Sequence, residues 1–208
     1  MNNPSLNIPL GDYEGHMALP TIGQAELLAS EFGALLKSHA PDSVALIGCA
    51  GGNGFDKAAE GGVSRLVGID LNPHYISSAQ HRYARTISGL ELHCADIQGD
   101  LPTVQPVELV YAALVFEYVD VAVALKNISR LCAPGGLLAV VLQLPKQGSD
   151  AVTASPFVSL KELSSIMKLV PPDEFRACAE TLGFFWKSQK IVTLQSGKQF
   201  SFQLFGQS

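Results

Sequence analysis

A run of apolar residues that breaks into glycines, VALIGCAGGNG at residues 44–54, constrains the fold more than any other part of this 208-residue sequence. A second apolar run, LVGID, ends in Asp70, 16 residues after Gly54. An apolar strand, a glycine turn, a helix and a second strand that ends in an acidic residue form one half of a nucleotide-binding crevice. Because neighbouring parallel strands end at the same edge of a sheet, we expect the glycine loop and Asp70 to lie together there.

Strand and helix patterns alternate along most of the chain. Helices are expected at residues 21–40, 55–60, 73–84, from an Asp120 cap to 131, and after Pro171. Strands are expected at residues 43–47, 66–69, 90–94, 107–116 and 137–144. The end of the chain, FFWKSQKIVTL and QFSFQLF joined by QSGK, predicts an antiparallel hairpin. This order predicts an α/β fold, a doubly wound Rossmann-like seven-stranded sheet that is mostly parallel with a terminal antiparallel β-hairpin.

Length and composition favour one domain. With 208 residues, 47% of them hydrophobic, the chain can bury one substantial core. We expect a single domain over residues 1–208: an N-terminal arm and helix at 1–40, a cofactor-binding core at 41–147, a cover over the site at 148–170, and a helix with the terminal hairpin at 171–208.

Charge and composition exclude several classes of function. The net charge of -5 and the scattered Lys and Arg residues argue against a broad nucleic-acid surface. No apolar stretch approaches the roughly 20 residues of a membrane-spanning helix, so we expect no membrane partner and a cytoplasmic location. The four cysteines include no CxxC pair and the histidines lack ligand spacing, so no metal site is expected. The oligomeric state is not set by the sequence.

The glycine loop and Asp70 each suggest a contact with a ligand. A glycine loop that precedes a helix presents backbone N–H groups at the positive end of the helix dipole, which favours an anionic group such as a pyrophosphate or a carboxylate. Asp70 is placed to accept hydrogen bonds from two ribose hydroxyls, so a free 2′-hydroxyl is expected. The alternative is that the glycines only make a tight turn and that Asp70 caps the following helix.

With these features the chain resembles the class I S-adenosylmethionine-dependent methyltransferases over nearly its whole length. The resemblance rests on VALIGCAGGNG, GID at Asp70, CADI at 94–97, ELVYAALVFEYVD at 108–120, LCAPGG at 131–136 and the terminal hairpin. It implies S-adenosylmethionine as the cofactor and methyl transfer as the activity. The acidic charge and the expected cover favour a small-molecule acceptor, and no Asn-Pro-Pro-Tyr-type sequence of nucleobase and amide methyltransferases follows the strand at 107–116.

The resemblance also implies a set of cofactor contacts. The glycine loop would lie against the methionyl part of the cofactor, Asp70 would hold the ribose with Leu71 beside the adenine, and Asp96 would reach the adenine amino group. The loop differs from the common GxGxG pattern by one extra residue. The candidate cofactor-binding residues are Tyr13, Gly48, Cys49, Ala50, Gly52, Asn53, Asp70, Leu71, Asp96, Ile97 and Ala113.

Three side chains are candidates for roles near the transferred methyl group. Methyl transfer from a sulfonium depends mainly on alignment, but a base helps when the acceptor is a hydroxyl or a protonated amine. Glu117 is the candidate base and Tyr118 its orienter; alternatively, Glu117 caps a helix or pairs with a surface Lys. Tyr13 would place a ring near the sulfonium, where a cation–π interaction contributes about 0.5–2 kcal/mol. Alternatively, this N-terminal arm only packs on the sheet.

Two other functions fit parts of the pattern. Gly48, Gly52 and Gly54 satisfy the GxxxGxG spacing of short-chain dehydrogenases, but no Tyr is followed four residues later by Lys. The dinucleotide pattern GxGxxG fails at Lys57, and the sequence has no GKS or GKT. A nicotinamide-dependent oxidoreductase is therefore the weaker alternative. The stronger one is a non-catalytic protein that binds S-adenosylmethionine or S-adenosylhomocysteine as a sensor or partner subunit.

Overall fold

The computed structural model describes residues 3–145, 153 and 155–208, and its seven strands form one sheet in the order β3-β2-β1-β4-β5-β7-β6. The strands are β1 (Ser43–Ile47), β2 (Arg65–Asp70), β3 (Leu90–Cys94), β4 (Val107–Ala113), β5 (Cys132–Gln143), β6 (Phe184–Thr193) and β7 (Gln199–Gln207). β1 to β5 pair in parallel, whereas β7 is antiparallel to both β5 and β6. The predicted fold class is confirmed.

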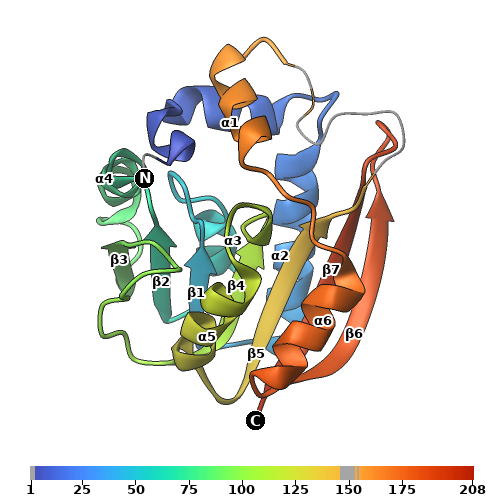
Figure 1. Ribbon diagram of the computed structural model, residues 1–208. Coiled ribbons are helices and arrows are strands. Elements are labelled where there is room, and N and C mark those ends of the chain that lie inside the picture. Colours follow the sequence, from blue (N-terminus) through green and yellow to red (C-terminus); the bar gives the residue numbers. More distant parts are fainter. Residues whose placement is uncertain (1–2, 146–152, 154) are drawn as a thin grey trace.

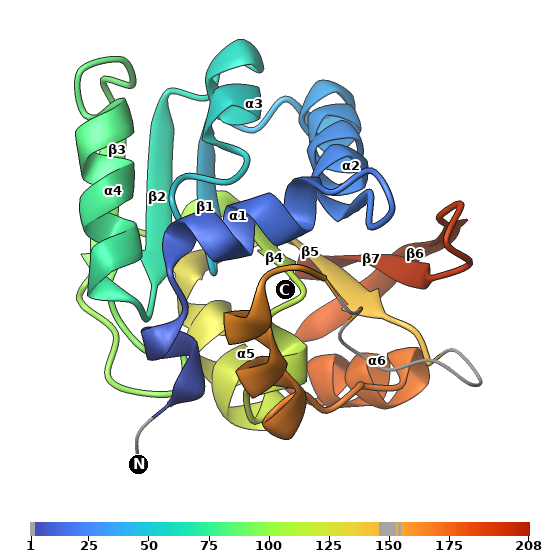
Figure 2. The same cartoon turned by 90° about the horizontal axis from the view of Figure 1, so that it is seen from above.

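Helices cover both faces of the sheet (Figures 1 and 2). Residues of α2 (Gln24–His39), α3 (Phe55–Glu60) and α4 (Pro73–Tyr83) share one buried cluster with side chains from one face of the sheet. α5 (Val121–Leu131) and α6 (Pro172–Thr181) share a second cluster with the other face. The predicted ranges of β1, α3 and β3 are confirmed to the residue. The predicted cap at Asp120 is confirmed, because its side chain accepts from the Val123 N–H, and Asn72 caps α4 in the same way by accepting from the His74 N–H.

Three short elements lie across the carboxyl ends of the parallel strands: η1 (Pro4–Asn7), α1 (Leu10–Ala18) and η3 (Val158–Ser165) (Figures 1 and 2). The Ser159 hydroxyl donates to Asp12 Oδ2 at 2.6 Å, and His16 Nδ1 lies 2.9 Å from Ser155 Oγ. These contacts join α1 to the segment that contains η3. Of the predicted cover at 148–170, residues 148–152 and 154 lie outside the described residues.

Two predicted strand boundaries were wrong by three or more residues. β4 ends at Ala113 rather than at 116, because Leu114 has a φ of +56° and a 3-10 helix, η2 (Phe116–Tyr118), follows. β5 begins at Cys132 rather than at 137, because Cys132 pairs with Val107 before the register shifts by a bulge. The first correction matters for the site, since the left-handed turn at Leu114 directs the next residues across the edge of the sheet.

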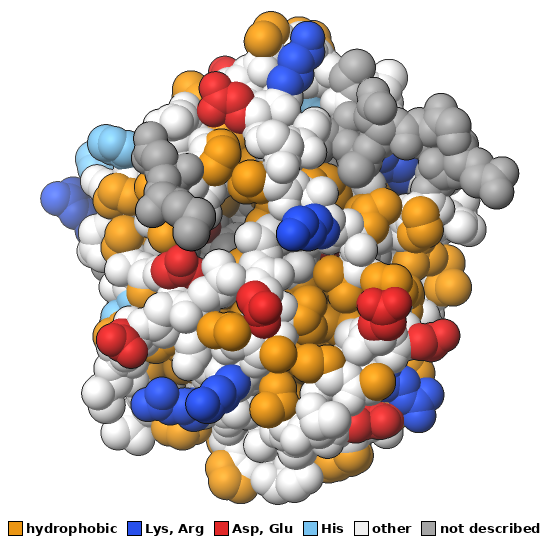
Figure 3. All heavy atoms as spheres, in the orientation of Figure 1, with side chains coloured by type: hydrophobic (Ala, Val, Ile, Leu, Met, Phe, Trp, Pro, Cys, Tyr) orange, Lys and Arg blue, Asp and Glu red, His pale blue; other side chains and the backbone are white. Residues whose placement is uncertain are grey.

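Charged side chains are dispersed over the face of the molecule that Figure 3 shows. The Lys and Arg side chains on this face are separated from one another, and acidic and hydrophobic side chains lie between them. Among residues 3–145, 153 and 155–208, no helix combines the length and the apolar character needed to cross a membrane.

A Phe175→Ala substitution is expected to lower the free energy of unfolding by about 3–5 kcal/mol, because it leaves a cavity where a ring packs against two others. Phe175 is 0% exposed, and its ring centroid lies 4.6 Å from that of Phe116 and 5.8 Å from that of Phe205. Phe185→Ala, at a ring that is 46% exposed, is the matched control and should cost less than about 1 kcal/mol. Denaturant unfolding measures both, and equal losses would contradict the assignment of this core.

Candidate functional site

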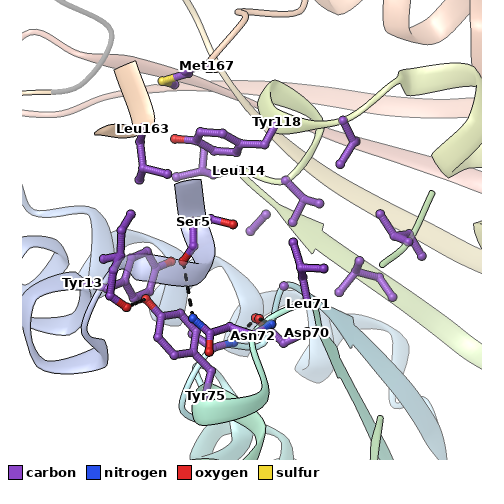
Figure 4. Close-up of a pocket in the computed structure, with 18 of the residues that line it drawn as sticks. Ser5, Tyr13, Asp70, Leu71, Asn72, Tyr75, Leu114, Tyr118, Leu163 and Met167 are labelled. Atoms are coloured by element: carbon purple, nitrogen blue, oxygen red, sulfur yellow. Dashed lines mark hydrogen bonds between the residues drawn. The ribbon is translucent and has the colours of Figure 1, made fainter. Parts of the chain in front are cut away.

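A cavity of about 210 Å³ lies at the carboxyl edge of the parallel strands, and Figure 4 shows its walls. The ends of β1, β2 and β4 form one side of it, and residues of α1 and η3 form another. In Figure 4, Tyr13, Asp70 and Tyr75 gather at one side, whereas Tyr118 lies across the cavity near Leu163 and Met167. Parallel pairing of the strands therefore brings residues from distant parts of the sequence into one hollow.

The glycine loop between β1 and α3 forms part of the wall through Gly48 and Ala50, both with positive φ. The N–H of Gly48 donates to the carbonyl oxygen of Ile69 at 2.8 Å, which continues the ladder between β1 and β2. A Cβ atom at Gly48 would lie 2.8 Å from Cγ2 of Val115, another residue of the wall. Glycine at this position therefore keeps the cavity open.

Asp70 places a carboxyl group in the same wall. Its Oδ2 accepts from the Ala50 N–H at 2.8 Å, and its Oδ1 accepts from the Asn72 N–H at 2.9 Å. Burial raises the pKa of Asp70, and these two N–H groups act against that rise. Because each carboxylate oxygen has two acceptor positions, both oxygens can still accept from a ligand. Asp70 thus makes local hydrogen bonds to the glycine loop and to the start of the next helix, and it also lines the cavity.

A second cavity, of about 340 Å³, lies along the other side of the glycine loop. Cys49, Gly52 and Asn53 line this cavity and not the first one. The ion pair between Arg82 and Glu14 contributes to its wall, and Arg82 also donates to the carbonyl oxygen of Gly51 at 3.2 Å. The residues that line both cavities are Tyr13, Met17, Ile47, Gly48 and Ala113.

Tyr13 lies where the two cavities meet. Its ring centroid is 6.0 Å from that of Tyr75, and the Tyr75 hydroxyl donates to the carbonyl oxygen of Ile8. Burial and the nearby Asp70 raise the pKa of Tyr13 to about 12, and a side-chain hydrogen bond with Asn53 acts against this rise. Tyr13 is therefore a neutral phenol at physiological pH, with its ring exposed to both cavities.

The first cavity brings together most of the residues that the sequence singled out. They are Tyr13, Gly48, Ala50, Asp70, Leu71, Asp96, Ile97, Ala113 and Tyr118. Asp96 Oδ1 also accepts from the Gln98 N–H at 2.9 Å. Tyr118 follows the turn at Leu114, and burial raises the pKa of its hydroxyl.

Glu117 is not part of the wall. It is 1% exposed, its Oε1 accepts from the Gln143 N–H at 2.7 Å, and its Oε2 has no hydrogen-bond partner among the described residues. Burial raises its pKa to about 7. A catalytic base must contact the acceptor directly. The Glu117 side chain does not line the cavity, whereas that of its neighbour Tyr118 does.

Five buried polar residues of the wall are not among the predicted site residues: His16, Gln24, Asn72, Gln143 and Lys198. Except for Asn72, they lie far in sequence from both the glycine loop and Asp70. Lys198 belongs to the QSGK turn, whose composition indicates only a hairpin. The pairing of β7 with β5 brings Gln143 and Lys198 into the cavity, whereas His16 and Gln24 come from α1 and α2. No described group of three or more His, Cys, Asp or Glu residues is arranged to hold a metal ion.

The sheet order 3-2-1-4-5-7-6, with a glycine loop after β1 and an acidic residue at the end of β2, defines the class I methyltransferase fold. In sequence, residues 46–140 match the family described as Methyltransferase domain. The chain is therefore similar to this family in sequence over residues 46–140 as well as in fold. Comparison with curated proteins gives no significant match.

Solved structures share the fold at low sequence identity. The N-methyltransferase NodS from Bradyrhizobium japonicum WM9, in complex with S-adenosyl-L-homocysteine, is 21% identical, with a TM-score of 0.73 over 99% of each chain. Magnesium protoporphyrin IX methyltransferase from Synechocystis PCC 6803, with bound S-adenosylmethionine, is 12% identical, with a TM-score of 0.66 over 90% of this chain and 81% of that one. The [4+2]-cyclase SpnF is 11% identical, with a TM-score of 0.65 over 84% and 81%. These likenesses show the fold.

A Glu117→Gln substitution is expected to stabilise the protein increasingly as the pH rises. The pKa of Glu117 is raised from 4.5 to about 7, so the folded state keeps a proton that the unfolded chain releases between these values. The stability that this group contributes is present below the unfolded pKa and is lost as the pH rises through the folded pKa. The amide of the variant does not titrate, so the difference in unfolding free energy should grow by on the order of 1 to 3 kcal/mol between about pH 5 and about pH 8.

Denaturant unfolding of both proteins at the two pH values measures this difference. Glu108→Gln, at an exposed carboxyl group on β4, is the control and should show a much smaller change with pH. A difference between wild type and Glu117→Gln that is the same at both pH values would contradict the raised pKa.

Proposed function

We propose that this protein is a methyltransferase that binds S-adenosylmethionine across the two cavities and transfers its methyl group to a small-molecule acceptor. The observation that carries the proposal is that the cavities meet at Tyr13, Gly48 and Ala113, with the Asp70 carboxyl group on one side of that point and the glycine loop on the other. The family match over residues 46–140 supports the same activity.

The lining residues fit the two ends of the cofactor. Asp70, Leu71, Asp96 and Ile97 in the first cavity combine carboxyl groups with apolar surface, which suits a ribose and an adenine ring. Cys49, Gly52 and Asn53 in the second cavity present the glycine loop to the methionyl end. The sulfur would then lie between these groups, beside Tyr13 and Gly48, and the acceptor would enter the remainder of the first cavity.

When bound, the cofactor supplies an electrophilic methyl group. The residues of this chain orient the two reactants, and orientation alone lowers such a barrier by about 7–11 kcal/mol. η1, α1 and η3 cover the carboxyl edge of the sheet and reduce the access of water. Tyr118 is the phenol on the acceptor side of the wall, where it orients the acceptor, and Glu117 positions it indirectly through the main chain at Gln143.

A second candidate function is binding of the cofactor without methyl transfer. The position of Glu117 behind the wall favours it, because no carboxylate on the acceptor side of the described wall is placed as a base. The fold neighbour SpnF, a [4+2]-cyclase, also indicates that this fold is compatible with other chemistry. Cytoplasmic location remains a prediction from the sequence.

An Asp70→Ala substitution is expected to weaken binding of both S-adenosylmethionine and S-adenosylhomocysteine at least about 100-fold, since two hydrogen bonds to a charged acceptor are lost. Isothermal titration calorimetry measures the two affinities, with NADH as a third ligand. Asp100→Ala, at an exposed loop carboxyl group, is the matched control and should bind as wild type does. Preferential binding of NADH, or unchanged binding by Asp70→Ala, would overturn the proposed site.

A Tyr13→Leu substitution is expected to weaken S-adenosylmethionine more than S-adenosylhomocysteine. Only the former carries the sulfonium charge, and a cation–π contact with the ring of Tyr13 contributes about 0.5–2 kcal/mol, or roughly 2- to 30-fold in affinity. Tyr13→Phe keeps the ring and should retain the difference between the two ligands. Equal losses for both ligands in Tyr13→Leu would show that the ring does not contact the sulfonium.

A further inference from the structure

We propose that His16 is the general base of the methyl transfer and that the acceptor is a small phenol whose hydroxyl group donates to its Nε2 atom. The inference rests on the proposed methyltransferase function, and it assigns both a catalytic residue and the chemical class of the acceptor. His16 belongs to α1, is only 7% exposed and lines the first cavity. A neutral imidazole in a closed cavity is well suited to remove a proton from a bound reactant.

One ring nitrogen of His16 has a partner in the chain and the other does not. Nδ1 lies 2.9 Å from Ser155 Oγ, and Nε2 makes no hydrogen bond with the described part of the chain. When Nδ1 carries the proton and donates to Ser155, Nε2 keeps the lone pair that accepts from a ligand. Ser155 Oγ also accepts from the Phe157 N–H at 3.3 Å, which holds the hydroxyl in place. The contact with Ser155 therefore orients the ring.

His16 lies on the acceptor side of Tyr13. The two residues are three apart on α1, so their side chains share one face of the helix, about 4.5 Å apart along its axis. Tyr13 lies where the two cavities meet, beside the proposed position of the sulfur. His16 is also close to Lys198, which precedes β7, and β7 is four strands from β2, or about 19 Å at ~4.8 Å per strand. The imidazole is therefore one helical turn from the sulfur, away from the adenosine end.

His16 is the group best suited to take a proton on this side of the described wall. The carboxyl groups that line the first cavity belong to Asp70 and Asp96, on the proposed adenosine side. Burial raises the pKa of the Tyr118 hydroxyl, so this phenol stays protonated. Burial and the nearby Lys198 lower the pKa of His16, so its ring is neutral at physiological pH and able to accept a proton.

A hydroxyl acceptor needs such a base, whereas a neutral amine attacks through its own lone pair. The acceptor oxygen attacks the methyl carbon while the bond between that carbon and sulfur breaks, and the electron pair of that bond stays on the sulfur of S-adenosylhomocysteine. The O–H proton passes to Nε2, and solvent then removes it from the imidazolium. A phenol, with a pKa of about 10, gives up its proton to a weak base more readily than an alcohol does. Met17, Leu163 and Met167 line the same cavity and offer apolar surface to the ring.

Gln24 supplies a second polar group beside His16. The Leu19 N–H donates to the carbonyl oxygen of His16, and the Ile22 and Gly23 N–H groups donate to that of Leu19. This turn brings the first residue of α2 back to the cavity wall. Gln24 is 6% exposed there, and its side-chain amide makes no hydrogen bond within the described residues. The amide N–H would donate to the acceptor oxygen and stabilise the charge that develops on it as the proton leaves.

The binding test uses 4-fluorophenol and 4-fluorotoluene, two probes of similar size that differ in the hydroxyl group. Fluorine NMR measures the affinity of each for the whole protein saturated with S-adenosylhomocysteine. 4-Fluorophenol should bind at least about fivefold more tightly, because only its hydroxyl group satisfies the buried Nε2 atom. His16→Met should remove this preference. His81→Met, at an exposed histidine on α4, is the matched control and should keep it.

A single-turnover reaction with S-adenosylmethionine and 4-fluorophenol separates binding from base catalysis. The wild type should form 4-fluoroanisole and S-adenosylhomocysteine. His16→Gln keeps a hydrogen-bond acceptor but does not take up a proton. This variant should therefore bind 4-fluorophenol within about threefold of the wild type, while methyl transfer slows at least about 100-fold.

Each other result overturns the inference. An unchanged preference in His16→Met would show that His16 does not contact the acceptor hydroxyl, and equal binding or no binding of the two probes would exclude a phenol site. Transfer by His16→Gln at the wild-type rate would exclude the base role, and wild-type binding of 4-fluorophenol without transfer would contradict that role together with the proposed function. Binding of S-adenosylmethionine and S-adenosylhomocysteine is measured first in every variant, so a failure of the cofactor site is distinguished from a failure of the acceptor site.

Discussion

The parallel pairing of β1 with both β2 and β4 is the constraint on which the rest of the structure depends. Ile47 at the end of β1 lies opposite Ile69 on one side and Ala112 on the other. The loops that follow these three strands therefore leave the sheet at the same level. The strand order reverses at this point, since the chain runs from β1 to β3 on one side and from β4 outward on the other. Loops that diverge at such a reversal leave a crevice between them, and both cavities are found there.

The carboxyl group of Asp70 connects this geometry to the ligand. By accepting from the Ala50 N–H, it holds a non-glycine residue at a φ of +47°, a conformation that costs on the order of 1 kcal/mol or more. The hydrogen bond to a charged acceptor offsets that strain. The same carboxyl group is partly buried in the cavity wall, so the glycine loop is held in a shape that leaves room for a ligand. The two interpretations of Asp70 from the sequence, a local structural role and a ligand contact, are therefore compatible.

The parts of the fold that the sequence predicted well are those that local patterns decide. The ranges of β1, α3 and β3 could be predicted because apolar runs and glycine turns within a few residues mark where each element begins and ends. α1 was expected only as an arm, because LGDYEGHMA contains two glycines and has a weak helical preference. Its contacts with α4 and η3, such as the pairs Glu14–Arg82 and Asp12–Ser159, favour the helix and have no local sequence signal. The end of β4 was misplaced for the same reason, since apolar residues continue past the turn at Leu114.

The β5–β7 side of the first cavity shows how strand direction, and not overall composition, decides which charged groups reach a cavity. β7 runs antiparallel to β5, so its first residues lie beside the last ones of β5, with Phe200 opposite Gln143. A parallel seventh strand would place its beginning at the other edge of the sheet, far from the cavity. The reversal of this one strand therefore brings the turn that contains Lys198 to the carboxyl edge. A chain with a net charge of -5 thus presents a buried ammonium group at one end of a cavity whose other end holds two carboxyl groups.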